Sequence, residues 1–273
     1  MTDRMISVVI VGARGRMGLA LLRAVMESDD MTMVGAVDRS DSPGMGHDVG
    51  RLIGVPDYGV ELTDELAPPR GSIVVDFSLP AATDGNVQRC VELGVPLVLG
   101  TTGLHKTTRD LLRAAAKDIP IVSAANFSVG VTLLTRIAGF VAHALGEQWD
   151  AELLEIHHSH KRDAPSGTAL RIAKAVAKAT ERDPETSIRT DRADPHARPR
   201  ERGEIGITAM RGGDSVGEHT LMFLSDGERL ELTHRAGDRA IFARGALRAA
   251  RWVVDKQPGL YTMADVLGLA GLS

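Results

Sequence analysis

The segment Ile6-Ser-Val-Val-Ile-Val11-Gly12-Ala-Arg-Gly-Arg-Met-Gly18 decides how the first half of this 273-residue chain folds. Its first six residues are apolar except for one serine, as expected of a strand that is buried on both faces. Three glycines follow at a spacing of three, and Leu19, Leu22 and Val25 then recur at helical spacing. The segment therefore predicts a strand, a tight turn and a helix in immediate succession.

The same alternation continues as far as residue 123. Strand-like apolar runs alternate with stretches of helical spacing, and glycine, proline or polar residues separate them. Alternating strands and helices are typical of βαβ units, so a Rossmann-like parallel sheet is predicted. The expected strands after the first are 31–37, 73–77, 96–99 and 119–123, and the expected helices with clear ends are 80–93 and 106–117.

A glycine loop between a strand and a helix can hold the phosphates of a dinucleotide. The spacing over residues 12–18 is G-x-x-G-x-x-G rather than the usual G-x-G-x-x-G, and a glycine triplet alone is a weak signal. Its context is stronger, because Asp38 ends the second strand where a ribose 2′-hydroxyl needs an acceptor. We therefore favour binding of NADH or NADPH over a purely structural turn. Asp38 suits NADH, whereas Arg39, helped by Arg16, could pair with the phosphate of NADPH, so the preference stays open.

Two further segments fall at the carboxyl ends of expected strands. They are Gly100-Thr-Thr-Gly103 and Ala124-Ala-Asn-Phe127. A ligand of a parallel sheet sits beyond these strand ends, so both segments are expected near the cofactor.

The second half of the chain has a different pattern, with long helices and strands that form hairpins. Asp226-Gly227 is a strong hairpin signal, and a mixed or antiparallel sheet is predicted. We expect a nucleotide domain of residues 1–127 and 238–273, and an α+β substrate domain of residues 128–237. The Arg- and Pro-rich segment 181–203 is given no role. The expected elements are helices 129–145, 169–180 and 238–254, and strands 150–158, 204–210, 218–224 and 229–234.

The segment Glu155-Ile-His-His-Ser-His-Lys-Arg-Asp-Ala-Pro-Ser-Gly-Thr168 holds three histidines and a lysine within five positions. Imidazole titrates near neutrality, and lysine can be tuned to release a proton. Ser166 then starts a helix, whose backbone N–H groups suit an anion such as a carboxylate. The alternative on this stretch alone is a polar surface loop with a helix cap.

A hydride carrier, proton donors and a carboxylate cradle together suit the reduction of a small unsaturated acid. In this interpretation His157 and Lys161 are the proton donors, because a proton must accompany the hydride. Neighbouring strand residues face opposite ways, so His158 should have a different task from His157. We expect His158 and the N–H groups of Gly167 and Thr168 to hold substrate carboxylates.

Several other classes of function are disfavoured. Three clustered histidines could suggest a metal, but no cysteine or H-E-x-x-H helix accompanies them, so no metal is predicted. A net charge of -4 and 3% aromatic residues argue against nucleic-acid binding. No apolar run reaches the length of a membrane span, and the first residues lack the features of a signal peptide. The single Cys90 is expected in the core, and a cytoplasmic protein is expected.

The chain resembles the dihydrodipicolinate reductase family of the diaminopimelate route to lysine. The motifs that carry the resemblance are 12–18, 100–103, 124–130, 216–219 and above all 155–168. They extend over essentially the whole chain. The long histidine-containing motif is far more specific than the glycine loop.

The resemblance implies a homotetramer that reduces the cyclic dicarboxylate 4-hydroxy-tetrahydrodipicolinate with NADH or NADPH, giving tetrahydrodipicolinate, NAD(P)⁺ and water. It implies proton transfer by His157 and Lys161 and substrate contacts by His158, Gly167 and Thr168. It matches the cofactor site to Gly12, Ala13, Arg14, Gly15, Arg16, Met17, Asp38, Arg39, Gly100, Thr101, Thr102, Ala124, Ala125, Asn126 and Phe127, with Arg39 as the NADPH contact.

Two rival functions are weighed against this one. A dehydrogenase of a semialdehyde or sugar shares the two-domain plan, but an acylating enzyme would want a catalytic cysteine in a loop, and Cys90 falls in an expected helix. A redox-sensing regulator that binds NAD(P) without chemistry would leave the histidine–lysine loop without a purpose. The reductase is therefore the favoured interpretation.

Overall fold

A computed structural model describes residues 5–190, 192, 196, 198–269 and 271. The chain divides into two compact units, each with its own sheet. The first unit is Met1–Ser128 with Arg239–Leu267, and the second is Val129–Asp238 with Gly268–Ser273. The chain passes from the first unit to the second, and back again, one residue later than the expected boundaries after residues 127 and 237. The described residues after Leu267 belong to the second unit, whereas they were expected in the first.

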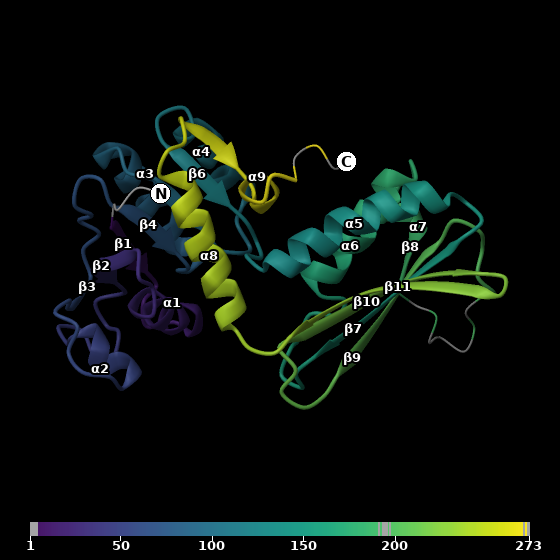
Figure 1. Ribbon diagram of the computed structural model, residues 1–273, viewed down its shortest axis with the longest axis horizontal. Coiled ribbons are helices and arrows are strands. Elements are labelled where there is room, and N and C mark those ends of the chain that lie inside the picture. Colours follow the sequence, from purple (N-terminus) through teal and green to yellow (C-terminus); the bar gives the residue numbers. More distant parts are fainter. Residues whose placement is uncertain (1–4, 191, 193–195, 197, 270, 272–273) are drawn as a thin grey trace. The chain divides into compact units, whose positions relative to one another are not determined.

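The first unit contains a seven-stranded sheet in which every strand pairing is parallel (Figure 1). The strand order is β12-β6-β5-β4-β1-β2-β3, which is the doubly wound order of a dinucleotide-binding fold with one strand added at the edge. The predicted Rossmann-like domain is confirmed. The strands are β1 (Ile6–Val11), β2 (Met31–Val37), β3 (Leu62–Thr63), β4 (Ile73–Asp76), β5 (Leu97–Leu99), β6 (Pro120–Ser123) and β12 (Gly259–Tyr261).

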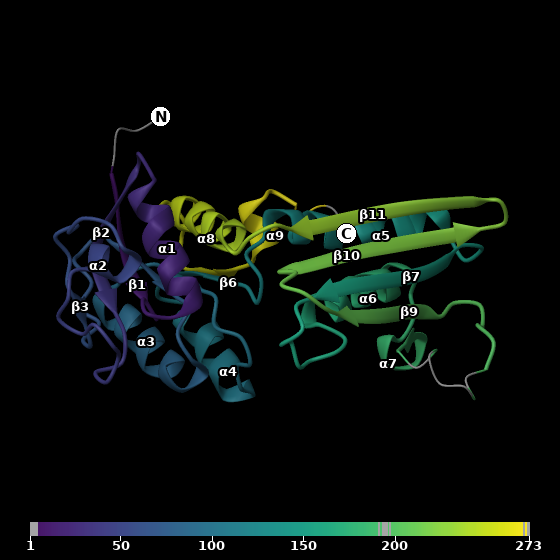
Figure 2. The same cartoon turned by 90° about the horizontal axis from the view of Figure 1, so that it is seen from below.

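Helices cover both faces of this sheet (Figure 2). Helices α1 (Arg16–Met26) and α8 (Ala240–Val253) pack together on one face, and α3 (Pro80–Leu93) and α4 (Lys106–Ala115) on the other. Because both faces are covered, the central strands are apolar throughout, and Cys90 of α3 is fully buried in that core. Burial raises the pKa of the Cys90 thiol to about 12, which suits its predicted place in the core. Two short helices, α2 (Val49–Ile53) and α9 (Met263–Val266), complete the unit.

The second unit is built on a five-stranded mixed sheet in the order β11-β10-β7-β9-β8. Strand β10 is antiparallel to both of its neighbours, whereas β7, β9 and β8 run parallel. The mixed sheet was one of the two predicted forms. Its elements are α5 (Val129–Leu145), β7 (Asp150–His157), α6 (Gly167–Ala179), α7 (Pro184–Ser187), β8 (Ile188–Arg189), β9 (Ile205–Arg211), β10 (Gly217–Ser225) and β11 (Glu228–Ala236).

One face of this mixed sheet packs on α5 and α6, which lie side by side (Figure 1). Strand β7 alternates strictly, and Ala151, Leu153, Glu155 and His157 are its buried residues. The alternation places the two polar residues on the helix-covered face, next to the apolar core. Within the described residues, no helix lies over the opposite face of the sheet.

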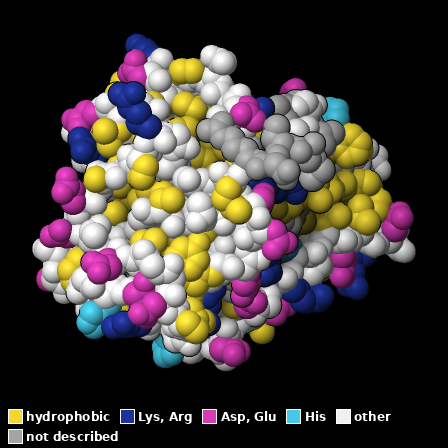
Figure 3. All heavy atoms as spheres, turned by 60° about the vertical axis from the view of Figure 1, so that its left-hand side comes forward, with side chains coloured by type: hydrophobic (Ala, Val, Ile, Leu, Met, Phe, Trp, Pro, Cys, Tyr) yellow, Lys and Arg dark blue, Asp and Glu magenta, His cyan; other side chains and the backbone are white. Residues whose placement is uncertain are grey.

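The described surface carries mixed charge. Acidic and basic side chains are interspersed among apolar ones on the face seen in Figure 3. Among the residues that the structure places, no helix is both long enough and apolar enough to cross a membrane.

Candidate active site

The glycine loop follows β1 at the carboxyl edge of the parallel sheet. The backbone N–H groups of Gly12 and Ala13 donate to the Val37 carbonyl at 2.9 and 3.1 Å, which ties the loop to β2. Gly12 has a φ of +77°, and a Cβ atom there would lie 2.8 Å from the Phe77 carbonyl oxygen. A Cβ atom at Gly18 would lie 2.1 Å from the Gly12 carbonyl oxygen. Only glycine allows helix α1 to start this close to the strand.

The start of α1 suits a pyrophosphate group. Its N-cap is Gly15, so no side chain accepts the N–H groups of the first turn at Arg16 and Met17. Such a helix start presents unsatisfied donors and the positive end of the helix dipole. Together with the space that the glycines leave, this donor set fits the phosphates of a dinucleotide.

Asp38 stands at the end of β2, beside the glycine loop. Its carboxylate accepts from the backbone N–H groups of Arg14 at 2.8 Å and Arg39 at 2.9 Å, and from the Ser42 hydroxyl. Burial would raise the pKa of Asp38, but these hydrogen bonds outweigh burial and lower it. An ionised acceptor therefore lies where a ribose hydroxyl is expected, while the exposed Arg39 pairs only loosely with Asp41 at 3.5 Å.

The other predicted cofactor residues follow β5 and β6 at the same edge. Thr101 donates to the Ser78 carbonyl at 3.1 Å, and a Cβ atom at Gly100 would lie 2.2 Å from the Phe77 ring. The Phe77 ring also packs on Phe127, with ring centroids 5.4 Å apart. A cavity of about 310 Å³ opens here, and its lining includes Thr101, Thr102, Ala124 and Ala125, together with Arg109 and Tyr261, which had not been predicted.

In the second unit, His157 is the last residue of β7 and is only 8% exposed. Its Nδ1 atom makes an ion-pair contact with Oε2 of Glu155, which precedes it by two residues and therefore lies on the same face. The predicted proton donor is thus held by a buried carboxylate. From the sequence, no role is predicted for Glu155. Its two-residue spacing from His157 on an expected strand is the signal that indicates this contact.

Glu155 receives further donors from two other elements. Arg211 at the end of β9 donates from Nη2 to Oε1 at 2.9 Å, and the backbone N–H of Ser166 donates to the same oxygen at 3.0 Å. Burial would raise the pKa of Glu155, but the contacts from His157, Arg211 and Ser166 hold it at about 2. The carboxylate is therefore ionised at neutral pH.

His219 of β10 completes the buried group. It stands opposite Glu155 in the register of β7 and β10, and its ring meets the His157 ring edge to face at 5.3 Å. Its Nε2 atom lies 3.3 Å from the Ser166 hydroxyl. Burial lowers the pKa of His219 to about 4, so its imidazole is neutral at neutral pH.

Lys161 and His158 lie in the loop after β7. The Lys161 ammonium donates to both oxygens of Asp163, at 2.7 and 2.8 Å, and its side chain is 21% exposed. The loop is tied down by backbone bonds from His158 N to the Ser215 carbonyl at 2.8 Å and from Lys161 N to the His158 carbonyl at 3.1 Å. The His160 ring lies 6.3 Å from the His158 ring. A cationic donor and a half-buried imidazole thus occupy one ordered loop.

Gly167 and Thr168 form the first turn of α6, as predicted. Ser166 is the N-cap, and its hydroxyl accepts from the Ala169 N–H at 3.1 Å. A side chain at Gly167 would meet nothing within 4 Å, so this helix start is open on the side of Gly167. The geometry fits the expected carboxylate cradle.

Among the described residues, Glu155, His157 and His219 offer one carboxylate and two imidazoles within 4.8 Å, a spacing that a metal ion could use. Glu155 is already neutralised by the Arg211 guanidinium, which disfavours a second cation beside it. The absence of a metal stays a prediction.

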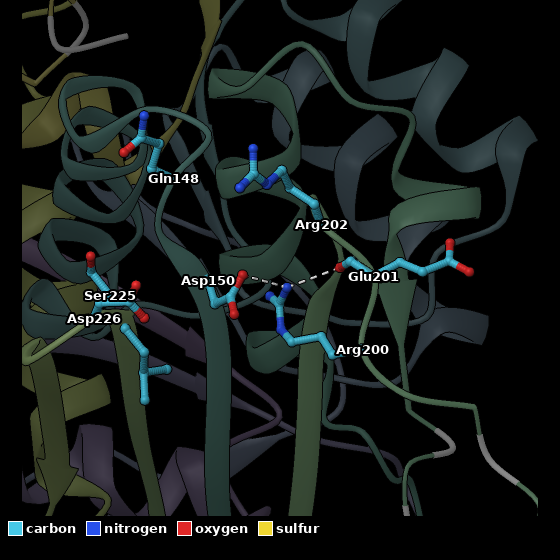
Figure 4. A pocket seen from close by; sticks show the side chains of 8 residues that line it. Gln148, Asp150, Arg200, Glu201, Arg202, Ser225 and Asp226 are labelled. Atoms are coloured by element: carbon cyan, nitrogen blue, oxygen red, sulfur yellow. Dashed lines mark hydrogen bonds and ion pairs between the residues drawn. The ribbon is translucent and has the colours of Figure 1, made fainter.

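A second cavity, of about 430 Å³, lies near the start of β7 (Figure 4). Arg200 points across it to Asp150, with Nη1 at 2.7 Å from Oδ1, and also reaches Glu152 at 3.1 Å. Nearby, the buried Glu204 pairs with Arg189, Arg192 and Arg198. Four arginines of the Arg-rich segment are therefore paired with carboxylates of the second unit. The groups that line this cavity do not form an arrangement for the chemistry predicted above.

We expect His219→Gln to reduce the acid sensitivity of folding. The pKa of His219 is about 4 in the folded protein and about 6.5 in an unfolded chain. A depressed folded-state pKa means that the stability is fully present above pH 6.5 and is lost as the pH falls toward 4. The loss between pH 7 and pH 5 is about 2 kcal/mol for one such group.

Urea unfolding at pH 7 and pH 5 measures this effect. The wild-type protein should lose about 2 kcal/mol more than His219→Gln between these values, and the glutamine keeps an acceptor for Ser166. Equal losses in the two proteins would contradict a neutral, buried His219.

Comparison with known sequences gives a consistent result over nearly the full chain. Residues 6–127 match the family model "Dihydrodipicolinate reductase, N-terminus", and residues 130–267 match the model of its C-terminus. The 4-hydroxy-tetrahydrodipicolinate reductase of Anaeromyxobacter dehalogenans (strain 2CP-C) is 45% identical over 271 residues, covering 98% of this chain and 99% of that protein. The protein of the same name from Thiobacillus denitrificans is 47% identical over 266 residues, covering 97% and 99%.

Solved structures share the fold. The dipicolinate-bound dihydrodipicolinate reductase from Paenisporosarcina sp. TG-14 has a TM-score of 0.74 at 24% identity and covers 96% of this chain and 98% of its own. An amine dehydrogenase from Mycobacterium smegmatis has a TM-score of 0.59 at 12% identity, covering 94% and 95%. The two-unit plan is therefore shared more widely than any one reaction.

Proposed function

The chain belongs to the dihydrodipicolinate reductase family, and on that premise we propose that it reduces 4-hydroxy-tetrahydrodipicolinate to tetrahydrodipicolinate with NADH or NADPH, in diaminopimelate and lysine biosynthesis. One observation in the structure supports this most strongly. The segment from Glu155 to Thr168 places an imidazole in contact with a buried carboxylate, an ammonium group and an open helix start close together in the chain. The first unit supplies the fold that holds the hydride carrier.

The reaction replaces a hydroxyl by a hydrogen, and it consumes one hydride and one proton and releases water. The nicotinamide cofactor, when bound, supplies the hydride. Its pyrophosphate would lie against the N–H groups of Arg16 and Met17, with the glycines of residues 12–18 giving it room. The remaining predicted cofactor residues, Asp38, Arg39, Gly100–Thr102 and Ala124–Phe127, line the same sheet edge.

Lys161 and His157 handle the protons in this proposal. The Lys161 ammonium donates the proton that leaves with the hydroxyl oxygen, and the His157 imidazole gives or takes a proton at Nε2. The carboxylates of the substrate are held by His158 and by the N–H groups of Gly167 and Thr168. Two carboxylates facing a cation, an imidazole and a helix start are electrostatically favourable.

Both nicotinamide cofactors should serve. The ionised Asp38 can accept from the ribose hydroxyl of NADH, while the Arg39 side chain, held only by a 3.5 Å contact, can turn to the phosphate of NADPH. We propose that the protein acts in the cytoplasm, which the single, buried Cys90 fits.

A coupled assay tests the function. Pyruvate, aspartate semialdehyde and the preceding synthase generate the substrate, and the loss of nicotinamide absorbance is followed with NADH and with NADPH separately. We expect oxidation of both cofactors only when the synthase and both of its substrates are present. No substrate-dependent oxidation with either cofactor would overturn the proposed reaction.

We also propose that the second unit assembles four chains into a homotetramer. The helix-free face of its sheet carries an apolar group of Leu154, Ile156, Met222, Leu224 and Met210, and Met210 is 51% exposed. The same face also carries charged residues, among them Glu152, Glu218 and Arg235. An exposed apolar group within such a charged surround is typical of an interface between protein chains.

Met210→Glu should therefore shift the protein to fewer chains per particle, because it buries a charge in the proposed interface. Light scattering after size-exclusion chromatography measures the mass. Met5→Glu is the matched control, because Met5 lies in the first unit and is 52% exposed. A tetramer that survives Met210→Glu unchanged would place the interface elsewhere.

A further inference from the structure

Glu155 is a fully buried carboxylate to which the proposed reaction gives no task. A buried charge is costly, and it persists only where donors compensate for the lost water. Glu155 has three donors from three different elements: His157 on its own strand, Arg211 at the end of β9, and the backbone N–H of Ser166 before α6. Such a convergence of elements on one side chain calls for a reason.

We infer that Glu155 is the positioning residue of the active site, which holds the His157 imidazole with its proton on Nδ1 and fixes the start of α6 beside it. This inference rests on the proposed role of His157. A carboxylate that accepts from one ring nitrogen sets the tautomer of a histidine and leaves the other nitrogen to exchange protons. Here the Oε2 contact occupies Nδ1, so the exchanging atom is Nε2.

The space beside Nε2 is preserved by a glycine. A Cβ atom at Gly217 would lie 2.9 Å from Nε2 of His157, so any side chain there would press on the ring. Gly217 also has a φ of +153°, which favours glycine. Glu155 therefore holds the ring at Nδ1, and the lack of a side chain at Gly217 leaves room beside Nε2.

The second oxygen of Glu155 acts on the substrate side. Oε1 accepts from the N–H of Ser166, whose hydroxyl caps α6 through Ala169. The next two residues are those proposed to hold a substrate carboxylate. One carboxylate thus fixes the proton-transferring imidazole with one oxygen and the carboxylate cradle with the other.

Arg211 extends this control along the loop. Its Nη2 atom bonds both Glu155 Oε1 at 2.9 Å and the Asp163 carbonyl at 2.6 Å, and the Asp163 side chain holds the Lys161 ammonium. Glu155 is therefore connected to Lys161 through the Arg211 side chain and then through the backbone and side chain of Asp163. All the proposed proton-handling groups share one anchor.

A purely structural ion pair is the alternative, and the chain contains one for comparison. Glu204 is also a buried carboxylate of the second unit, and it pairs with Arg189, Arg192 and Arg198, none of which belongs to the proposed site. Removing either charge should lower stability. Only the loss of Glu155 should alter the chemistry of His157.

The test compares Glu155→Gln with Glu204→Gln. The amide of Glu155→Gln can still accept from Ser166 and Arg211, but the NH₂ group that then faces His157 can only donate, so the ring must move its proton to Nε2. We expect kcat to fall about 100-fold. This value lies between the loss of about 10- to 100-fold on removing a carboxylate that bonds a metal-ligating histidine and the loss of about 10⁴-fold on removing one that bonds a catalytic histidine. The affinity for NADH should stay within about twofold of the wild-type value.

Two control variants accompany Glu155→Gln. Glu155→Asp keeps the charge and should restore much of kcat, and Glu204→Gln should leave kcat within about twofold of the wild-type value.

A spectroscopic readout separates this inference from the proposed reaction. Long-range ¹H–¹⁵N spectra of histidine-labelled protein report the tautomer of each ring, and the His157 signals are those missing in His157→Gln. We expect a proton on Nδ1 in the wild-type protein and on Nε2 in Glu155→Gln, whether or not the enzyme turns over. An unchanged tautomer, or kcat equal to that of Glu204→Gln, would overturn the positioning role.

The experiments distinguish a failure of the proposed role of His157 from a failure of the positioning role of Glu155. Full activity in His157→Gln would contradict the proposed role of His157 and would remove the positioning role with it. If Glu155→Gln does not fold, Gly217→Ala provides the second variant, because its methyl group displaces the ring and leaves Glu155 in place. The displaced ring should lose its contact with Glu155 Oε2, so we expect a lower kcat and a loss of the fixed proton on Nδ1 in Gly217→Ala. A folded Gly217→Ala in which the ring has moved away from Glu155, but which keeps wild-type kcat and the proton on Nδ1, would also overturn the inference.

Discussion

Replacing Lys161 with alanine is expected to lower kcat by about 10²- to 10⁴-fold, the usual contribution of a positioned general acid. The Lys161 ammonium is held at 2.7 and 2.8 Å from the two oxygens of Asp163, and its side chain is mostly shielded from solvent. A water molecule can replace the donor only in a less ordered position, so the proton transfer becomes slow. The cofactor phosphates are proposed to bind in the first unit, so we expect the affinity for NADH and NADPH to change little.

Steady-state kinetics with each cofactor and direct titration of the nucleotide measure the two effects. Lys174→Ala is the matched control, because it removes the same side chain from the exposed face of α6 in the same unit. Its kcat should equal that of the wild-type protein. If nucleotide affinity collapsed in Lys161→Ala while turnover held, the proton-donor role would be wrong.

The larger elements could be predicted from sequence because their patterns are strong. The expected strands 6–11 and 31–37 match β1 and β2 at both ends, and the expected helices 80–93 and 129–145 match α3 and α5. The ends of the other expected elements with stated ends differ by at most two residues. Continuous apolar runs mark strands that are buried on both faces, and helical spacing marks helices with one buried face. These local signals coincide with the tertiary structure, so they were sufficient.

The elements that were missed are short or lie at a sheet edge. Strands β3 and β8 have two residues each, and β12 has three. A run of two or three residues carries no periodicity, and pairing with a neighbouring strand is what makes it a strand. Such short strands form only by pairing with a neighbouring strand, so they could not be predicted from the sequence before the sheet was known.

The residues of the loop after β7 could be predicted from the sequence, but the residues of other strands that contact them could not. Lys161 and the histidines come from one contiguous motif, whereas Arg211 and His219 come from β9 and β10. They meet the motif because the strand register sets His219 opposite Glu155 and Arg211 opposite His157. Register is a property of the assembled sheet, and no spacing in the sequence reveals it.

The Arg-rich segment shows the same limitation. Arg200 reaches Glu152 and Asp150 across 48 and 50 positions of the chain. From sequence alone its charges were indistinguishable from a solvated surface. Pairing with buried or half-buried carboxylates depends on where the chain returns, and only the structure supplies that.

Two glycine-to-alanine changes in helices of the first unit should have opposite effects. Gly18 lies in α1 and Gly85 lies in α3. In an exposed helix interior, alanine is favoured over glycine by about 1 kcal/mol, because glycine loses more backbone freedom on folding. A Cβ atom at Gly85 meets nothing within 4 Å, so Gly85→Ala should raise the free energy of unfolding by about that amount.

Gly18→Ala should instead lower the free energy of unfolding by about 3 kcal/mol and greatly weaken NADH and NADPH binding. The new Cβ atom would lie 2.1 Å from the Gly12 carbonyl oxygen and 2.5 Å from the Ala13 carbonyl carbon, and both are backbone atoms that no rotamer change can move. Helix α1 must then retreat from the loop, which withdraws the N–H groups of its first turn from the phosphates. Urea unfolding and nucleotide titration of both variants measure the two effects. A Gly18→Ala protein as stable as Gly85→Ala, with wild-type nucleotide affinity, would mean that the close approach of α1 to β1 does not build the phosphate site.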